Sequence, residues 1–274
     1  MTASLTSALL ATVASGITTV ELGQPLFTGM PCSPNHPGFR MLLARRHGDM
    51  NRPDGSSAAN EVLITGGHVG THIDALAHVS FQGKLFGGVD AYQAQTGGRF
   101  SELGVDQIPP LVTRGVLLDV AATRGVDSLA GGYGVTDTDL ADAAERAGVT
   151  PQPGDVALVR TGWARHFGDA GTYLGQDTGV PGVTEAGARW LADRQVVATG
   201  TDTTAYEQIP AGEGHRLLPV HKLLLVERGI YIMEHLNLED AAARGLTEFV
   251  FVVAPLRILG GTGSPIRPFA VVGA

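Results

Sequence analysis

The sequence predicts a single α/β domain over residues 1–274, with a mixed β-sheet and flanking helices. Three observations predict this fold class. Short apolar runs rich in β-branched residues recur along the whole chain, as strands do. Helical patterns alternate with these runs in the second half, whereas the first half is rich in strands and loops. No repeat, low-complexity tract or linker interrupts the chain.

Each of these apolar runs is a predicted strand. In chain order they cover residues 17–22, 61–65, 115–121, 155–161, 196–201, 229–234, 248–256 and 269–273. The stretch 1–16 is mildly apolar and has no Lys or Arg before its apolar part, as a secretory signal would need. We therefore expect a short helix there that caps the fold.

Capping residues mark the other predicted helices. Thr136 is placed to cap a helix that Gly148 and Pro151 end, and Thr184 is placed to cap a second one. Residues 220–229 are apolar on one side and stop at a glycine, which predicts a third helix.

Residues 23–60 form the longest irregular segment, with five prolines between Pro25 and Pro53. Long irregular segments in compact domains are often functional. The segment is expected to form either a lid or pocket wall, or a surface loop or oligomer contact.

Composition and charge narrow the function classes. The formal net charge is -8 and no basic stripe is visible, which argues against a nucleic-acid partner. No run reaches the roughly 18 apolar residues that span a membrane. The single cysteine, Cys32, excludes an internal disulfide and a zinc site built on several thiolates. We expect a cytoplasmic protein that acts on a small molecule.

Potential metal ligands crowd the segment HVGTHIDALAH, which contains His68, His72, Asp74 and His78. A regular helix would turn Asp74 away from the two preceding histidines. A regular strand would separate His68 from His72 by roughly 13 Å, at about 3.3 Å per residue. The chain must therefore curl if these side chains are to meet, and three glycines give it that freedom: Gly66, Gly67 and Gly70.

The residue types indicate which ion would bind. Two imidazoles and one carboxylate suit a divalent cation such as zinc or manganese and leave room for water, whose pKa the cation lowers. His78 lies further along and is expected to be a base or acid beside the metal. The alternative is a loop whose histidines are unrelated, which so dense a cluster disfavours.

This segment closely resembles the His-x-Gly-Thr-His-x-Asp-x-Pro-x-His motif of the metal-dependent cyclase family, which includes bacterial kynurenine formamidase and isatin hydrolase. Leu76 stands at the proline position of the motif. Further stretches resemble the family in the same order: ELGQPLFTGMP (21–31), GTDTTAYE (200–207), VHKLLLVERGIYIMEHLNL (220–238) and VAPLRILGGTGSPIRPFAVV (253–272). The resemblance implies the cyclase-like, swivelling β/β/α fold.

The resemblance also implies roles for named positions. It implies that His68, His72 and Asp74 bind the catalytic metal and that His221 and Glu234 complete the site. Two zinc ions per chain are implied by the formamidase-like members, and one manganese by the isatin-hydrolase-like members. In the same comparison His78 is the proton-transfer residue, with Glu234 able to assist. A homodimer or homotetramer is implied as well.

Four other polar residues are weaker candidates. Asp202 either orients a metal-bound histidine or serves as an ordinary turn residue. His36 is a possible pocket residue, and His215 is expected in a surface loop. His235 directly follows Glu234, so a continuing strand would point it to the opposite face.

Together these observations predict a metal-dependent hydrolase that cleaves a C–N bond of a small amide or lactam, isatin- or formylkynurenine-like. Two alternatives stay open: a metal-dependent lyase, dehydratase or cyclase acting on a small carbonyl compound, and a non-catalytic metal-binding protein. The glycine-rich GGTGSP (260–265) lacks the lysine of a P-loop, and no Gly-x-Ser-x-Gly motif is present, which disfavours nucleotide binding and serine hydrolysis.

Overall fold

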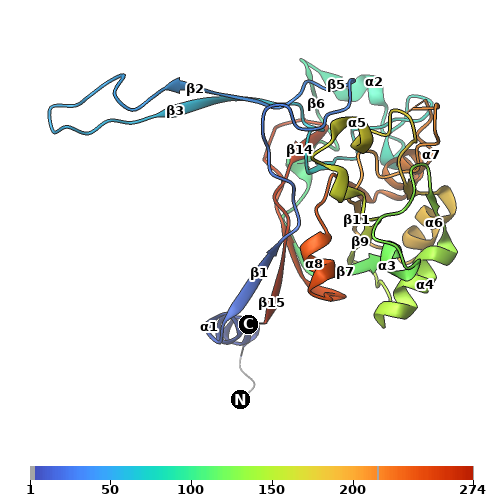
Figure 1. Cartoon of the computed structure of the whole chain (residues 1–274). Coiled ribbons are helices and arrows are strands. Elements are labelled where there is room, and N and C mark those ends of the chain that lie inside the picture. Colours follow the sequence, from blue (N-terminus) through green and yellow to red (C-terminus); the bar gives the residue numbers. More distant parts are fainter. Residues whose placement is uncertain (1–3, 215, 274) are drawn as a thin grey trace.

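One mixed sheet organises the chain (Figure 1). The computed structural model describes residues 4–214 and 216–273, without the side chain of Leu5, so His215 lies outside the described residues. Within them, strands β7, β9, β11 and β12 run parallel, and the other pairs of the sheet are antiparallel. The order across the sheet is β1 (Ile17–Glu21), β15 (Phe269–Gly273), β13 (Glu248–Val253), β7 (Leu111–Asp119), β9 (Val156–Arg160), β11 (Ala198–Thr201), β12 (Tyr231–Glu234), β4 (His72–Asp74) and β14 (Gly263–Pro265). The predicted α/β class with a mixed sheet is confirmed.

Both faces of the parallel strands are buried, as expected where helices cover a sheet. Along β9, Ala157 and Val159 pack into the core cluster that includes residues of α4 (Asp137–Ala147) and α6 (Glu185–Asp193). The alternate residues, Val156 and Leu158, belong to a second cluster with residues of β13, β4 and α8 (Glu239–Ala243). The period-2 alternation of strands therefore divides each apolar run between two cores.

The helix-capping predictions are confirmed. The Thr136 hydroxyl accepts a hydrogen bond from the Asp139 N–H at 3.2 Å, and the Asp139 carboxylate accepts one from the Thr136 N–H at 2.8 Å. Gly148 ends α4 in the left-handed region, at a φ of 66°, and Thr184 caps α6.

The short elements are α2 (Ala91–Ala94), α3 (Val120–Thr123), α5 (Ala170–Tyr173), η1 (Phe86–Gly88), η2 (Val105–Gln107), η3 (Trp163–His166), and the strand pairs β5 (Gln95–Thr96) with β6 (Arg99–Phe100) and β8 (Gly134–Val135) with β10 (Gly182–Val183).

The helix predicted over 220–229 has an unusual form. It begins as α7 (Pro219–His221) and continues as a π-helical segment, η4 (Lys222–Arg228), that ends at Gly229 with a φ of 66°. Short π-helical segments are often found at functional sites. His221 lies at the junction of the two segments.

The predicted strand 61–65 does not join the main sheet. Strands β2 (Arg40–Arg45) and β3 (Asn60–Ile64) pair with each other and form a hairpin that stands clear of the body (Figure 1). All eleven strand residues are exposed. We call residues 40–64 the arm. The run EVLIT is as apolar as a core strand, although it lies in the exposed arm. Its partner strand, β2, lies within the segment 23–60, which was expected to be irregular.

The N-terminal helix is present but does not cap the core. Helix α1 (Leu5–Ala14) projects beside β1 and the C-terminal strand β15 (Figure 1). Its apolar side chains are open to solvent: Leu9 is 59% exposed, Leu10 64% and Val13 56%. Among the described residues, none of the helices is both long enough and apolar enough to cross a membrane.

Candidate metal centre

Two neighbouring strands carry three of the candidate ligands, namely His72, Asp74 and Glu234. His72 and Asp74 are two residues apart on β4, so they project from the same face of the strand. Strand β12 pairs antiparallel with β4 in a register that sets Glu234 opposite His72. Residues directly opposite in an antiparallel pair share a face, so all three side chains meet. The three are buried.

A glycine turn brings His68 to the same place. Gly70 has a φ of 64°, a conformation that suits glycine. The chain reverses there, and the His68 Nδ1 atom lies 2.7 Å from Asp74 Oδ1. The His68 Nε2 atom lies 2.9 Å from the Thr262 hydroxyl. The predicted curl is confirmed, although only Gly70 of the three glycines takes a positive φ.

His72 is held by its own backbone. Its Nδ1 atom lies 2.7 Å from the Gly70 carbonyl oxygen, so the Nδ1–H donates and Nε2 is left with its lone pair. Nε2 faces two carboxylates, at 3.4 Å from Asp74 Oδ1 and 3.5 Å from Glu234 Oε2. Hydrogen bonding of one ring nitrogen while the other faces the site is the usual arrangement of a metal-ligating histidine.

His221 is held in the same way, by a residue that sequence reasoning did not select. Its Nδ1 atom lies 2.5 Å from Glu207 Oε1, and the backbone N–H groups of Val220 and His221 donate to the same carboxylate at 3.2 and 3.3 Å. The Nε2 atom therefore faces Glu234 Oε1 at 3.2 Å and Asp74 Oδ2 at 3.7 Å. Glu207 is the last residue of GTDTTAYE (200–207), and the resemblance of this stretch to the family was the signal in the sequence that could have identified it.

Asp202, the candidate for that orienting role, does something else. It accepts hydrogen bonds from the Thr161 N–H, the Thr161 hydroxyl and the Gly162 N–H at 2.6 to 2.9 Å. It fixes a turn after β9, which is the second of the two roles expected for it. The partner of the candidate ligand His221 is Glu207, five residues later.

His78 lies at the edge of the cluster. Its ring stacks on that of His68, with centroids 3.8 Å apart, and its centroid is 6.2 Å from that of His221. Burial and the neighbouring imidazoles, opposed by the Asp74 carboxylate, lower the pKa of His78 to about 3. The imidazole is therefore neutral at pH 7.

Leu76 replaces the motif's proline without loosening the segment. Its side chain is 7% exposed and packs into the core cluster of the α4 side. The backbone around it is tied down by hydrogen bonds from the Ala75 N–H to the Thr262 oxygen at 2.9 Å and from the Ala77 N–H to the Leu103 oxygen at 3.1 Å.

Two further histidines lie beside the cluster. The ring of His36, from the segment before the arm, is 5.5 Å from that of His68. His36 therefore lies beside the site, as expected of a possible pocket residue. His235 is buried, and its ring is 5.8 Å from that of His72. The prediction that His235 points to the opposite face from Glu234 was wrong, because β12 ends at Glu234 and His235 has a φ of 55°.

The charges of the cluster are strongly coupled. Burial alone would raise the pKa of Asp74, but the imidazoles of His78, His68 and His72 hold it well below its usual value. Burial opposes the charged form of His221, yet the Glu207 and Glu234 carboxylates outweigh it and raise its pKa well above the usual value. The same balance, through Asp74 and Glu234, raises the pKa of His72. Carboxylate charge thus faces the ring nitrogens of His72 and His221.

The donor set fits a divalent cation. In the described part of the chain, every ion pair of Asp74 and Glu234 is with a histidine. Asp74 Oδ2 is buried and has no hydrogen-bond partner there, which is costly for a carboxylate oxygen. Ligand atoms lie within 4.8 Å of one another in three groups: His68, Asp74 and His78; Asp74, His221 and Glu234; and His72, Glu234 and His235.

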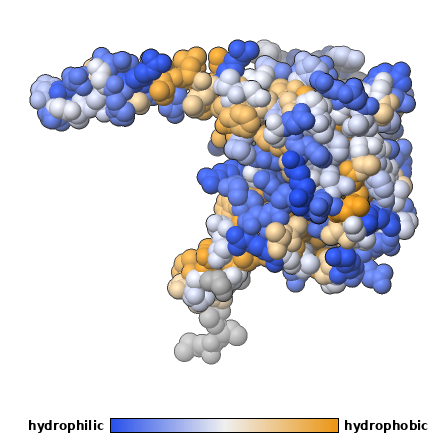
Figure 2. Space-filling model, in the orientation of Figure 1, coloured by the Kyte–Doolittle hydropathy of each residue, from blue (hydrophilic) through white to orange (hydrophobic). Residues whose placement is uncertain are grey.

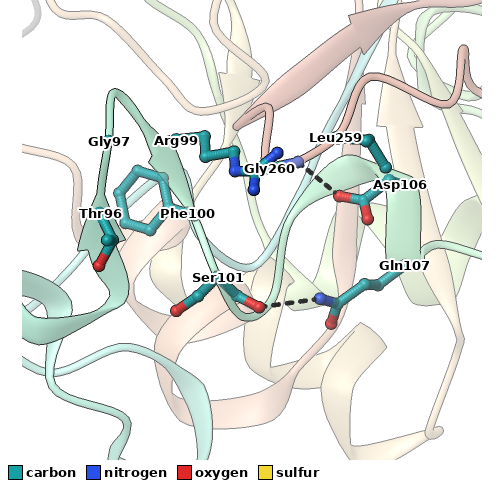
Figure 3. A pocket seen from close by; sticks show the side chains of 9 residues that line it. All are labelled: Thr96, Gly97, Arg99, Phe100, Ser101, Asp106, Gln107, Leu259 and Gly260. Carbon is teal, nitrogen blue, oxygen red and sulfur yellow. Dashed lines mark hydrogen bonds between the residues drawn. The ribbon is translucent and has the colours of Figure 1, made fainter.

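The surface cavities are separate from this cluster or border it. A cavity of about 640 Å³ lies between the β5–β6 hairpin and Gly260, where Arg99, Phe100 and Asp106 point into it (Figure 3). None of the candidate ligands lines it. A cavity of about 340 Å³ is lined by Pro34, Leu174 and Thr204, and the Thr204 hydroxyl lies 3.4 Å from His235 Nε2. The smaller cavity therefore borders the histidine cluster.

Comparisons with known proteins also relate this chain to cyclases and isatin hydrolases. A family model described as "Putative cyclase" matches residues 20–208. An isatin hydrolase of Roseibium aggregatum is 28% identical over 222 residues, which cover 80% of this chain and 77% of the relative. The crystal structure of a novel cyclase aligns with a TM-score of 0.84 at 26% identity, over 96% of this chain and 92% of that one. Isatin hydrolase A from Ralstonia solanacearum aligns with a TM-score of 0.75 at 27% identity, over 99% and 98%. The first metal motif and Glu207 lie inside the matched range, and His221 and Glu234 follow it.

Proposed function

The chain belongs to the putative cyclase family, and from this membership we propose that it is a metal-dependent hydrolase of a small amide or lactam. It would act as one cyclase-like domain over residues 1–274. The observation that carries the proposal is the buried cluster in which Asp74 and Glu234 face histidines alone, with Asp74 Oδ2 lacking a hydrogen-bond partner among the described residues. The printed names of the relatives suggest isatin or a related cyclic amide as substrate.

His68, His72, Asp74, His221 and Glu234 would hold the metal. The carboxylates each face two sides, since Asp74 Oδ1 lies near His68 and His72 and Oδ2 near His221. Glu234 Oε1 lies near His221 and Oε2 near His72. Two carboxylates placed between two sets of imidazoles support two ions per chain, and the N/O donors suit zinc or manganese.

A divalent cation at this site would supply a water whose pKa is low enough for deprotonation near neutral pH. His78 is neutral, so a ring nitrogen can accept the proton of the attacking water. Water then adds to the amide carbonyl, and the C–N bond breaks as the same imidazole returns the proton to the leaving nitrogen. Glu234 is the other candidate for moving the proton.

Metal content per chain, measured by elemental mass spectrometry before any chelator is added, tests this proposal first. We expect about two zinc ions, or one manganese if a single-metal site is built. His72→Ala should lose both metal and hydrolysis of isatin or N-formylkynurenine. A protein that holds no metal and takes up none on reconstitution would contradict the proposal, as would a metal-free His72→Ala protein with full activity.

The products separate hydrolysis from the alternative reactions of this family. Hydrolysis makes the summed mass of the products exceed that of the substrate by one water and yields a carboxylate, whereas a dehydratase would make an organic product lighter by one water. A lyase or cyclase would leave the summed mass of the products unchanged. Mass spectrometry of the product therefore decides between the two classes.

We also propose that the chain acts as a homodimer or homotetramer in the cytoplasm. The arm supports an assembly because both of its faces are apolar: Leu42, Val62 and Ile64 on one side, and Met41, Leu43 and Leu63 on the other. An isolated two-stranded hairpin is marginally stable in water. The arm holds four arginines and three acidic residues, whereas the whole chain has a net charge of -8, so the body of a second copy complements it.

A further inference from the structure

His235 has a backbone conformation that aims its side chain at the metal centre. Strand β12 ends at Glu234, and the φ of 55° at His235 is rare for a residue with a side chain. Two hydrogen bonds hold it there: the His235 N–H donates to the Thr203 oxygen at 2.9 Å, and the Thr71 hydroxyl donates to the His235 oxygen at 2.6 Å. Unfavourable conformations that are held so firmly cluster at functional sites.

The turn places His235 against two of the candidate ligands. One ring nitrogen of His235, one of His72 and one carboxylate oxygen of Glu234 lie within 4.8 Å of one another. All three residues are buried. His221 faces Oε1 of Glu234, whereas His72 faces Oε2. His235 therefore extends the His72 side of the centre, and with His72 and Glu234 it forms a set of two imidazoles and one carboxylate.

We propose that His235 is a further metal ligand of this chain and binds the ion that His72 and Glu234 hold. The inference rests on the proposed metal-dependent function and adds a sixth side chain to the five named there. Two imidazoles and a carboxylate are donors that zinc and manganese accept.

The surroundings of the ring suit this role. A metal-ligating histidine commonly has its second ring nitrogen beside an oxygen that fixes its orientation. The Thr204 hydroxyl lies 3.4 Å from His235 Nε2, and the buried ring of Tyr173 lies 5.4 Å away and packs beside it. Thr204 also lines the cavity of about 340 Å³. The imidazole thus stands between that cavity and the carboxylates.

The test replaces the imidazole and keeps the backbone. His235→Asn is suitable because asparagine tolerates the left-handed region, and His235→Gly tolerates it without any side-chain donor. Zn²⁺ and Co²⁺ are the probes: ions per chain after dialysis, affinity by chelator competition, and the visible absorption bands of the Co²⁺-loaded protein. We expect both variants to lose at least tenfold in affinity for one ion and to change the Co²⁺ spectrum. His166→Asn is the matched control, since it removes a histidine that packs on Trp163 and belongs to none of the three groups of possible ligands, and it should bind as the wild type does.

The outcomes distinguish this inference from the proposed function. If the wild type binds neither Zn²⁺ nor Co²⁺, the metal-dependent function fails and this inference fails with it. If the wild type binds metal and a folded His235→Asn or His235→Gly protein binds it equally, with an unchanged Co²⁺ spectrum, only the role of His235 is overturned. A change in His166→Asn as large as that in His235→Asn would also overturn it, because the effect would then not depend on the position of the lost imidazole.

Discussion

At the scale of single residues, the candidate centre depends on how each histidine uses its second nitrogen. His72 donates one N–H to a backbone carbonyl, and His221 places one nitrogen against Glu207. Each ring is thereby oriented before any ion binds, with the other nitrogen toward Asp74 and Glu234. His78 differs because its ring is held by stacking on His68. It is thus better placed to exchange a proton than to be a fixed ligand.

His78→Ala should keep the metal and lower turnover. General acid–base catalysis typically contributes about 10²–10⁴-fold in rate, so kcat should fall by that order while metal content per chain stays at the wild-type value. Steady-state hydrolysis of isatin together with elemental analysis measures both quantities. His166→Ala, which removes a histidine that packs on Trp163, is the control and should keep the wild-type kcat. Loss of metal in His78→Ala would instead make His78 a ligand.

At the scale of elements, the centre needs the turn between β3 and β4. Gly70 reverses the chain so that His68 reaches Asp74, and the space above its Cα is filled by the side chains of Leu26 and Met30. Gly263, on β14, lies so close to the His68 ring that any side chain there would displace it. Glycine is thus required for two different reasons, a positive φ at Gly70 and a close approach at Gly263.

Gly70→Ala should destabilise the protein and loosen the metal. A left-handed alanine costs roughly 1–2 kcal/mol, and the added methyl must also displace Leu26 and Met30. The matched control is Gly148→Ala, which has nearly the same φ and no neighbouring atom within 4 Å, so it bears the backbone cost alone. Thermal unfolding and metal content measure the effects. Equal losses of thermal stability, with full metal in both variants, would show that the contacts at Gly70 do not matter.

At the scale of the whole molecule, two projections mark the surface. The arm and α1 extend from the same side of the body in Figure 1, and Figure 2 shows apolar patches at the root of the arm and around α1. The segments before and after the arm carry His36 and His68, and the Gly66 N–H joins them by donating to the Pro37 oxygen at 3.0 Å.

Replacing Leu42 and Leu63 by serine should shift the protein toward the monomer. One substitution lies on each face of the arm, where these side chains are 53% and 58% exposed. Light scattering coupled to size-exclusion chromatography gives the mass, and 28.5 kDa corresponds to one chain. Leu217→Ser removes an apolar side chain that is 76% exposed outside the arm, and it should leave the mass unchanged. A wild-type protein that is already monomeric would contradict the proposed assembly.

Several features were predictable from local patterns. The spacing of His68, His72 and Asp74 predicted a curled segment, and the glycine at position 70 supplies the turn. Apolar runs predicted the strands β1, β7, β9, β11, β12, β13 and β15 of the sheet but not β4 or β14, and Thr136, Gly148 and Thr184 predicted helix ends. Each of these depends on interactions within a few residues, where side-chain periodicity and capping operate. The motif resemblance added the late pair, His221 and Glu234.

The sequence by itself thus determined the α/β class, the ends of its main helices and which side chains of the first motif could converge. Only the tertiary structure decided that Glu207 orients His221, that His235 turns toward His72 and that the run 61–65 leaves the sheet for the arm. Strand partners, backbone dihedrals at strand ends and the burial of an apolar run are set by long-range packing. Glu207 lies after β11 and His221 at the end of α7, so the two meet only through tertiary packing, of which a local pattern carries no record.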